Sequence, residues 1–292
     1  MREALISFPM FGEDFVLNPP YNIMIGSFPI YLYGIIISCG FLLAFLYGLK
    51  FHDRLDISMD EVFDLIIFAV PAAIAGARLY FVIFNWSQYA NDLISILWIR
   101  DGGLAIYGGV IGAALAVYFR CRHKRYSIWP PLDIMSFGLF IGQSVGRWGN
   151  FFNREAFGYE TGIFCRMGLT LPGRETVYVH PTFLYESLWN LLGLIIMHII
   201  CKKRRKYQGQ FFFFYIFWYG LGRMFIEGLR TDSLWLIPDV IRASQLLAGL
   251  TMAAAGAICI INHRRVAQGK KPLFGGALPA SPSEADGENV CG

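Results

Sequence analysis

The chain has 292 residues, of which 55% are hydrophobic and only 16% are charged, and its mean hydropathy is +0.47. Soluble domains carry about 25% charged residues, so this composition excludes an ordinary soluble protein and predicts a polytopic membrane protein. The six cysteines have no CxxC spacing, which argues against a zinc site and against a disulfide framework. The first residues, MREALISFPMFGEDF, lack the pattern of a cleavable signal peptide.

A helix that crosses a bilayer needs about 20 mostly apolar residues. We therefore expect an all-α membrane protein, a bundle of seven transmembrane helices within residues 1–262. The seven predicted spans are residues 29–49, 62–84, 102–119, 133–151, 182–201, 210–227 and 243–262.

Basic residues indicate how these spans are oriented. Lys and Arg are retained on the cytoplasmic side of a membrane, and the basic runs of this chain fall in alternate loops, at 50–54, 120–125, 202–206 and 264–271. This pattern predicts an N-terminus outside the cytoplasm and a C-terminus inside it. Topology and contact with anionic lipids account for the runs, so no nucleic-acid partner is expected.

Two segments lie outside the helical pattern. Residues 152–181 form the longest loop on the outer side and contain Pro172-Gly173 and further glycines, which predicts a small extracytoplasmic cap. Residues 263–292 are polar and end in PSEADGENVCG, a composition typical of a disordered cytoplasmic tail.

With this orientation, polar side chains from six spans share one depth, in the outer half of the membrane. Ionisable groups are costly in hydrocarbon and usually mark a functional site. In a compact bundle they would line one cavity open to the outer side. They are Tyr31, Tyr33, Arg78, Asp101, Tyr107, Arg147, Asn150, His180, Tyr185, Glu186, Arg223 and Glu227.

The segment GRWGNFFNREAFG, residues 146–158, holds the densest group of these polar residues. Arg147, Asn150 and Arg154 are three and four residues apart, so they share a face if the helix continues. Arg223 and Glu227 form an i,i+4 pair on another helix. Two arginines at one depth predict an anionic ligand, and guanidinium matches phosphate in a bidentate manner. The abundant anion at this depth is a phospholipid headgroup.

Structural interpretations stay open for several of these residues. Arg147 is also placed as an interfacial arginine would be, and Arg223–Glu227 would also serve as a neutralised structural pair. The glycines of residues 101–109 suit close helix packing as well as a headgroup against bare backbone. Arg78 and Glu186 are better interpreted as structural partners than as reactants.

At five places the chain resembles the bacterial prolipoprotein diacylglyceryl transferase family. The signature is GRWGNFFNREAFG at 146–158, supported by the DGG…GG stretch at 101–109 and by HPTFLYE at 180–186. The other two are Tyr219-Gly-Leu-Gly-Arg223, followed by Glu227 and Arg230, and the pair Tyr33-Gly34. The resemblance covers about residues 20–262.

The resemblance implies a transferase of the bacterial cytoplasmic (inner) membrane. Such an enzyme moves the sn-1,2-diacylglyceryl group of phosphatidylglycerol to the lipobox cysteine of a prolipoprotein. A thioether forms and glycerol 1-phosphate leaves, as the first step of lipoprotein maturation. The family uses no metal and no soluble cofactor, and its active site faces the extracytoplasmic side.

By position in these motifs, the expected catalytic residues are Arg147, Arg223, Tyr107 and Glu155. The two arginines would bind the phosphate and stabilise the charge that develops on it. Asn150 and Glu155 would order the headgroup and the signature loop. The remaining expected binding residues are Tyr33, Gly102, Gly103, Gly108, Asn153, His180, Tyr219, Glu227 and Arg230.

Tyr107 departs from the pattern, because some family members have a histidine there that has been proposed as the base for the thiol. A tyrosine with a pKa of about 10 is a poorer base at neutral pH. Three interpretations remain: nearby arginines lower its pKa, it only hydrogen-bonds the headgroup, or the positive potential of the site activates the thiol. We adopt the last as a hypothesis.

Two other classes fit less well. A lipid or anion transporter would need paired polar groups on both sides of the midplane, but those of this chain gather toward one side. An intramembrane protease would need a Ser/His or paired-Asp arrangement, and Asp64 and Asp133 are single aspartates at predicted cytoplasmic ends.

Overall fold

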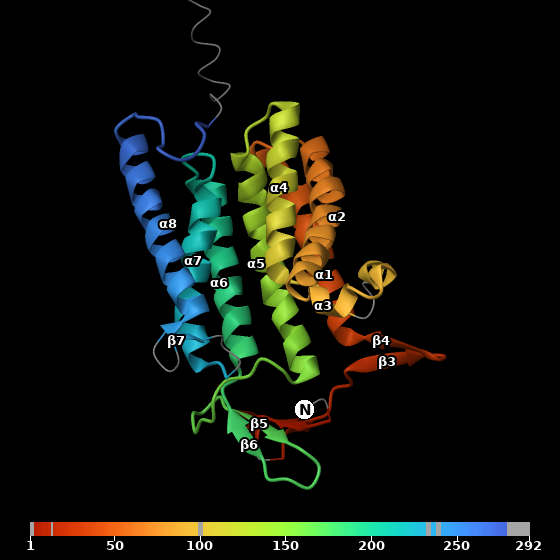
Figure 1. Cartoon of the computed structure of the whole chain (residues 1–292). Coiled ribbons are helices and arrows are strands. Elements are labelled where there is room, and N and C mark those ends of the chain that lie inside the picture. The colour runs from red at the N-terminus through yellow and green to blue at the C-terminus, as the bar shows by residue number, and fades with distance from the viewer. Residues whose placement is uncertain (1–2, 13, 99–101, 232–234, 238–240, 279–292) are drawn as a thin grey trace, which may run out of the picture. The chain divides into compact units, whose positions relative to one another are not determined.

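The computed structural model describes residues 3–12, 14–98, 102–231, 235–237 and 241–278. Within these ranges, seven helices of 17 to 26 residues overlap the seven predicted spans (Figure 1). They are α1 (Leu32–Phe51), α2 (Met59–Phe84), α4 (Ile106–Lys124), α5 (Trp129–Asn153), α6 (Thr182–Lys203), α7 (Gln210–Ile226) and α8 (Ala243–Ala267).

Four of these helices are long and apolar enough to cross a membrane, namely α2, α6, α8 and α1 with the turn that follows it. The other three are shorter or carry charged residues: α7 has 17 residues, α4 ends in a basic run, and α5 contains Asp133 and Arg147. The described part of the chain is therefore mostly helical, with four candidate membrane-spanning helices. The count of seven spans and their orientation stay predictions.

The expectation of an all-α chain is wrong in detail, because short strands form three small sheets. One sheet has the order β2-β1-β5-β6, and two-stranded sheets pair β3 with β4 and β7 with β8. The strands are β1 (Leu5–Ser7), β2 (Val16–Leu17), β3 (Asn22–Ile25), β4 (Phe28–Tyr31), β5 (Met167–Thr170), β6 (Val177–Val179), β7 (Trp235–Ile237) and β8 (Ile241–Arg242). A four-residue helix α3 (Trp86–Tyr89) and short 3-10 turns complete the elements.

The cap predicted for residues 152–181 includes the N-terminal segment as well. Antiparallel pairing sets Ile6 of β1 opposite Leu169 of β5 and opposite Leu17 of β2. Ile6 is fully buried and packs in one cluster with Leu169, Phe151 and Phe183, which joins the sheet to the ends of α5 and α6. Burial of these apolar side chains is the main stabilising contribution to this small sheet.

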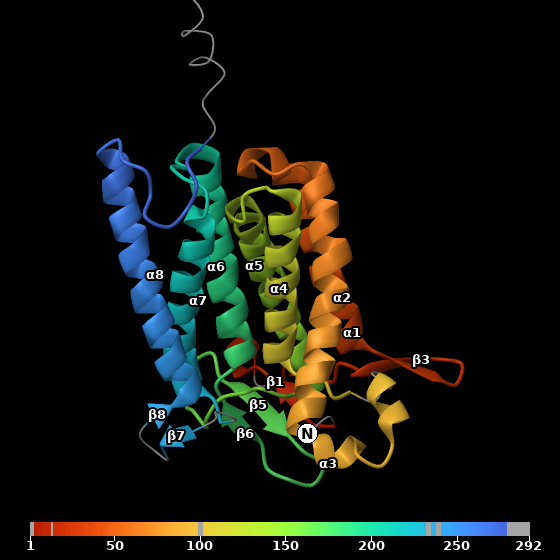
Figure 2. The same ribbon diagram turned by 45° about the horizontal axis from the view of Figure 1, so that its top comes forward.

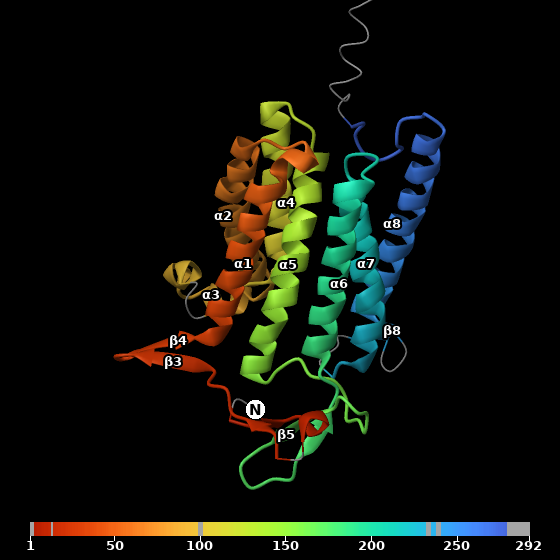
Figure 3. The same cartoon turned by 180° about the vertical axis from the view of Figure 1, so that it is seen from behind.

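The chain divides into two compact units. The first contains residues up to Gly48 and residues Asp133–Leu278, and the second contains residues Leu49–Leu132. In the first unit α6, α7 and α8 stand side by side, α5 lies beside α6, and α1 lies beside α5 (Figures 1 and 3). The sheet of β1, β5 and β6 covers one end of these helices (Figure 2), which we call the strand end.

Close approach of α1 and α5 depends on a glycine near the strand end. A side chain at Gly149 would place its Cβ 2.7 Å from the ring of Tyr33, a separation that real Cβ atoms do not show. The signature glycine therefore allows the aromatic ring of α1 to lie directly on the backbone of α5.

The opposite end of the first unit is held by buried polar side chains. Asp133 is fully buried and accepts hydrogen bonds from the backbone N–H groups of Gly209, Phe211 and Phe212, at 2.8 to 3.0 Å, which satisfies the start of α7. The Asn262 side chain, also fully buried, bonds the backbone of Leu273 and Phe274.

The prediction of a disordered tail from residue 263 is wrong for its first part. Residues 263–267 continue α8, and the following segment returns to pair Gly276 with Gln208 through two backbone hydrogen bonds. The local composition did predict a polar segment, but it gave no sign of the buried Asn262 that binds it. Residues 279–292 lie outside the described part of the chain.

In the second unit, α2 and α4 lie side by side (Figures 1 and 3). A Cβ at Gly108 would lie 2.3 Å from the carbonyl oxygen of Gly76, so the two helix backbones are in direct contact there. Ser58 and Glu61 form a capping box at the start of α2, and Arg120 pairs with Asp64 at 2.8 Å.

Candidate functional site

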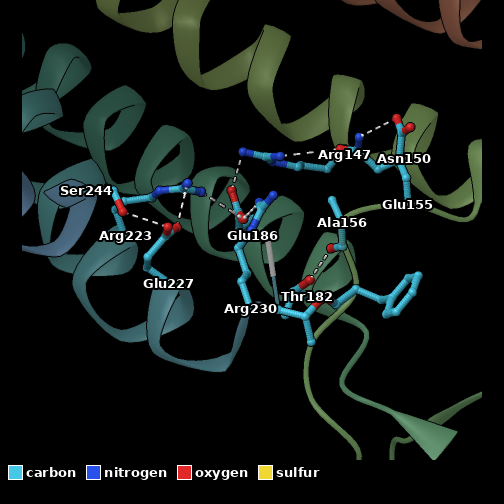
Figure 4. Close-up of polar contacts among 12 residues, drawn as sticks. Arg147, Asn150, Glu155, Ala156, Thr182, Glu186, Arg223, Glu227, Arg230 and Ser244 are labelled. Carbon is cyan, nitrogen blue, oxygen red and sulfur yellow. Dashed lines mark hydrogen bonds and ion pairs between the residues drawn. The ribbon is translucent and has the colours of Figure 1, made fainter. Parts of the chain in front are cut away.

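A carboxylate from α6 connects three arginines at the strand end of the first unit (Figure 4). Glu186 Oε2 forms an ion pair with Nη2 of Arg147 from α5. Glu186 Oε1 lies 3.4 Å from Nη1 of Arg223 on α7 and 3.0 Å from Nη1 of Arg230, which follows α7. We call Arg147, Arg223, Arg230, Glu186 and Glu227 the arginine cluster.

A second carboxylate holds Arg223 from its own helix. Glu227 Oε2 lies 2.5 Å from Arg223 Nη2, which confirms the i,i+4 pair predicted from spacing. Ser244, at the start of α8, donates a hydrogen bond of 2.6 Å to Glu227 Oε1. Arg242 contributes a further contact by donating to the backbone carbonyl of Glu227. Helices α7 and α8 are thus joined at this end by Glu227.

Burial separates the two kinds of charge in the arginine cluster. The carboxylate side chains are 5% exposed for Glu186 and 3% for Glu227, whereas Arg147 and Arg223 are 22% and 20% exposed. Each of these two guanidinium groups has five N–H donors. Arg147 bonds Glu186 and Asn150, and Arg223 bonds Glu186 and Glu227, so donors remain for an anion.

The signature loop after α5 is ordered by amide–carboxylate contacts. Asn150 Nδ2 and Asn153 Nδ2 both donate to Glu155 Oε1, at 3.0 and 3.2 Å. Asn150 Oδ1 in turn lies 3.3 Å from Arg147 Nη1. The chain Arg147–Asn150–Glu155 matches the ordering role expected for Asn150 and Glu155, although a headgroup contact by either residue stays a prediction.

Arg154 does not share the face of Arg147, because the helix does not continue to it, as a shared face would require. Helix α5 ends at Asn153, and Arg154 takes a left-handed backbone conformation with φ of 51°. Its guanidinium is 2% exposed and donates to the carbonyls of Ala4, Phe152 and Pro19 and to Asn18 Oδ1. Arg154 therefore fastens the N-terminal segment to the signature loop.

Three other predicted binding residues of the first unit have defined surroundings. His180 Nδ1 lies 3.4 Å from the Tyr185 hydroxyl, and burial lowers the pKa of His180, which favours the neutral imidazole. Tyr219 lies one helical turn before Arg223, and its ring stacks on Tyr215. Tyr33 packs on Gly149, as described above.

The remaining predicted residues belong to the second unit, where Gly102 and Gly103 surround Arg78. Arg78 donates to five backbone carbonyls, including those of Gly102 and Gly103 at 2.9 and 3.0 Å. Both glycines have positive φ, of 92° and 75°, so they allow the turn around this guanidinium. An open cavity of about 430 Å³ borders Arg78, with Tyr89 and Trp98 among its lining residues.

The structure changes the interpretation of two predicted residues of the second unit. Gly108 is buried against α2, so close packing accounts for this glycine without a headgroup. Tyr107 is 64% exposed, and its ring centroid lies 6.5 Å from that of Tyr80. Arg78 has the structural role expected of it.

Glu186 has a larger role than the sequence suggested, because it contacts three arginines. Its place in the HPTFLYE motif and its predicted depth were the signals that could have identified it. Within the described residues, no three His, Cys, Asp or Glu side chains come close enough to hold a metal ion.

Comparison with known proteins gives one consistent result. The family model described as prolipoprotein diacylglyceryl transferase matches residues 20–262. Curated proteins named phosphatidylglycerol–prolipoprotein diacylglyceryl transferase, from two strains of Bacillus cereus and from Bacillus anthracis, are 43% identical over 256 residues. Each match covers 85% of this chain and 93% of the relative. With a family match over most of its length and relatives of this identity, the chain belongs to the prolipoprotein diacylglyceryl transferase family.

Proposed function

We propose that this protein transfers the diacylglyceryl group of phosphatidylglycerol to the lipobox cysteine of a prolipoprotein. The names of the relatives at 43% identity support the two substrates and the group that is moved. The observation within the molecule that carries the proposal is the arginine cluster, in which Arg147 and Arg223 are bound to one carboxylate and remain partly exposed.

The chemistry required of the site is displacement of a phosphate from a glycerol carbon. The cysteine sulfur forms a bond to that carbon, and the bond from the carbon to the phosphate oxygen breaks. The electron pair of the broken bond stays on the oxygen, so glycerol 1-phosphate leaves, and the thiol proton passes to solvent or to the product. Charge grows on the phosphate during this step, and Arg147 and Arg223 would stabilise it.

The thiol must lose its proton, and a free cysteine has a pKa of about 8.5. Positive potential lowers a thiol pKa because it stabilises the thiolate. Arg147 and Arg223 supply such a potential, and for this reason we assign thiol activation chiefly to the arginines, with Tyr107 outside the proton transfer. Tyr107 is largely exposed, which is compatible with headgroup contact instead.

We place the reaction at the extracytoplasmic face of the cytoplasmic membrane. The basic runs of the first unit support this orientation, since Lys202 and Lys203 in the last turn of α6 and Arg264 and Arg265 in the last turn of α8 lie at the helix ends away from the strand end. In this arrangement all seven long helices cross the membrane, residues 1–262 form the catalytic domain, and the strands form its outer cap.

The test uses the full chain, purified in nanodiscs that contain phosphatidylglycerol, with a synthetic lipobox peptide as acceptor. Mass spectrometry should detect a peptide that carries diacylglycerol through a thioether, together with free glycerol 1-phosphate. A peptide with serine in place of the lipobox cysteine should remain unmodified, because the neutral hydroxyl is a far weaker nucleophile than a thiolate.

A matched pair of variants ties the activity to the arginine cluster. Arg147→Ala should lower the rate of product formation by about 10²-fold or more, whereas Arg174→Ala, which changes an exposed arginine of the cap, should leave it unchanged. Absence of the thioether product with a folded wild-type protein would reject the proposed function.

A further inference from the structure

The carboxylate of Glu186 contacts both arginines that are proposed to bind the lipid phosphate, and the reaction above gives it no task. It reaches Arg147 with Oε2 and Arg223 with Oε1, so both oxygens are engaged by the groups that would hold the ligand. Arg230 fixes Oε1 through a further contact of 3.0 Å. The carboxylate is therefore a fixed anion within the anion site.

Burial keeps the Glu186 carboxylate in contact with the arginines. Glu186 is 5% exposed, and its backbone lies in the middle helix of the three that supply the contacts, α5, α6 and α7. A ligand phosphate would have to approach the exposed part of Arg147 and Arg223, since Glu186 already contacts both of them. The two anions, one from the protein and one from the ligand, then share the same two guanidinium groups.

Substrate and product differ in charge, so the positive potential at the two arginines affects their binding to different degrees. The phosphodiester of phosphatidylglycerol carries one negative charge. The phosphate monoester that leaves has a second pKa near 6, so it carries about two negative charges at neutral pH. A site built from arginines alone would hold the product more strongly than the substrate.

Resting on the function proposed above, we infer that Glu186 promotes release of the phosphate product by lowering the positive potential at Arg147 and Arg223. Electrostatic energy is the product of charge and potential, so a given fall in potential weakens binding of a dianion twice as much, in free energy, as binding of a monoanion. Glu186 acts through the two guanidinium groups and not on the lipid, which makes it a positioning residue.

The inference predicts a quantitative relation between two affinities. When Glu186→Gln removes the charge, the affinity for a dianion should rise by the square of the rise for a monoanion. An increase of about threefold for the monoanion should accompany an increase of about tenfold for the dianion. A residue that only held the helices together would change both affinities by the same factor.

The measurement uses the full-length protein in nanodiscs at pH 8 and two soluble probes of similar size. Glycerol 1-phosphate is the dianion, and glycerophosphoglycerol, the deacylated headgroup of phosphatidylglycerol, is the monoanion. Calorimetric titration gives both dissociation constants for wild type, for E186Q and for the control Glu175→Gln, which changes an exposed glutamate of the cap. The control should match the wild type with both probes.

Kinetics supply a second readout. E186Q should show a first turnover at least as fast as in the wild type, followed by a slower steady state, with both kcat and the KM for phosphatidylglycerol lowered. Added glycerol 1-phosphate should inhibit it at about tenfold lower concentration than the wild type. A loss of the first turnover itself would contradict a role in release.

Equal changes in both affinities, or no change in either, would overturn the inference. If E186Q does not fold, Glu186→Asp is used, which moves the charge away from the arginines by one methylene. In this variant the affinity for the dianion should again rise more than the affinity for the monoanion, by a smaller factor. The proposed function fails separately, when the wild type neither binds glycerophosphoglycerol nor modifies the lipobox peptide. If the wild type binds glycerophosphoglycerol and modifies the peptide, but the Glu186 variant gains equally in affinity for both probes, only the proposed role of Glu186 is rejected.

Discussion

Arg147 and Arg154 belong to the same short segment, yet the structure gives their guanidinium groups opposite surroundings. Arg147 is held by a carboxylate, keeps unused donors and is 22% exposed. Arg154 is held by three carbonyls and an amide oxygen and is 2% exposed. In the second unit Arg78 repeats the second pattern with five carbonyls.

Structural arginines and ligand-binding arginines differ in the groups that hold the guanidinium. Carbonyl groups use up every direction of the planar guanidinium fork and fix the backbone segments that carry them. A shared carboxylate orients the fork but leaves part of it open to a second anion.

The largest effect is expected at the carboxylate-held arginines. Arg147→Ala and Arg223→Ala should each lower kcat/KM by about 10²–10³-fold, because each removes a donor to the charge that forms on the phosphate. The thermal midpoint in detergent should fall as well, because the buried carboxylates of Glu186 and Glu227 lose part of their pairing, so activity is compared per folded molecule. A variant that keeps activity within a factor of ten would show that its arginine does not contact the phosphate.

Arg154→Met should act on stability instead. It leaves the buried carbonyl of Ala4 and the partly buried carbonyl of Pro19 without their donor, at a cost of about 2–4 kcal/mol. The thermal midpoint should fall by several degrees, while the activity per folded molecule is retained. A full loss of activity in a folded variant would place Arg154 with Arg147.

A smaller effect is expected for Tyr107→Phe. Removal of a general base costs about 10²-fold or more, so activity within about threefold of wild type is expected if the hydroxyl transfers no proton. The assay is thioether formation on the lipobox peptide between pH 6 and pH 9. Loss of activity to background would show that the hydroxyl is needed and would reject activation by the arginines alone.

The smallest effect concerns pH and stability at His180. Burial lowers its pKa in the folded protein below the ordinary value of 6.5, so below that pH the unfolded chain binds more protons than the folded one. This contribution is fully present above pH 6.5 and is lost as the pH falls. The thermal midpoint should therefore decrease from pH 7 to pH 5, and His180→Gln should reduce this slope. If His180→Gln leaves the pH dependence of the thermal midpoint unchanged, the lowered pKa of His180 is not its cause.

The sequence predicted those parts of the molecule that depend on nearby residues. The apolar stretches marked the seven long helices, and the spacing of Arg223 and Glu227 gave a real ion pair. The resemblance located the segments that meet at Glu186. Each of these features depends on composition or on separations of a few residues.

The remainder depends on contacts between distant parts of the chain. Arg154 turns away from the face of Arg147 because it bonds the carbonyls of Ala4 and Pro19. These residues lie 150 and 135 positions earlier in the chain, so no local pattern could predict the contacts. The pairing of β1 with β5 and the pairing of Gly276 with Gln208 also join segments that are far apart in the sequence. The central place of Glu186 follows from the meeting of three helices, which no local pattern records.

The most direct test of the central claim is binding of glycerophosphoglycerol to the purified protein in nanodiscs. Wild type and Arg154→Gln should bind it with the same dissociation constant once the folded fraction is taken into account. Arg147→Gln and Arg223→Gln, corrected for the folded fraction in the same way, should weaken binding by at least about tenfold. Equal affinity in all four proteins would contradict the assignment of the phosphate to the carboxylate-held arginines.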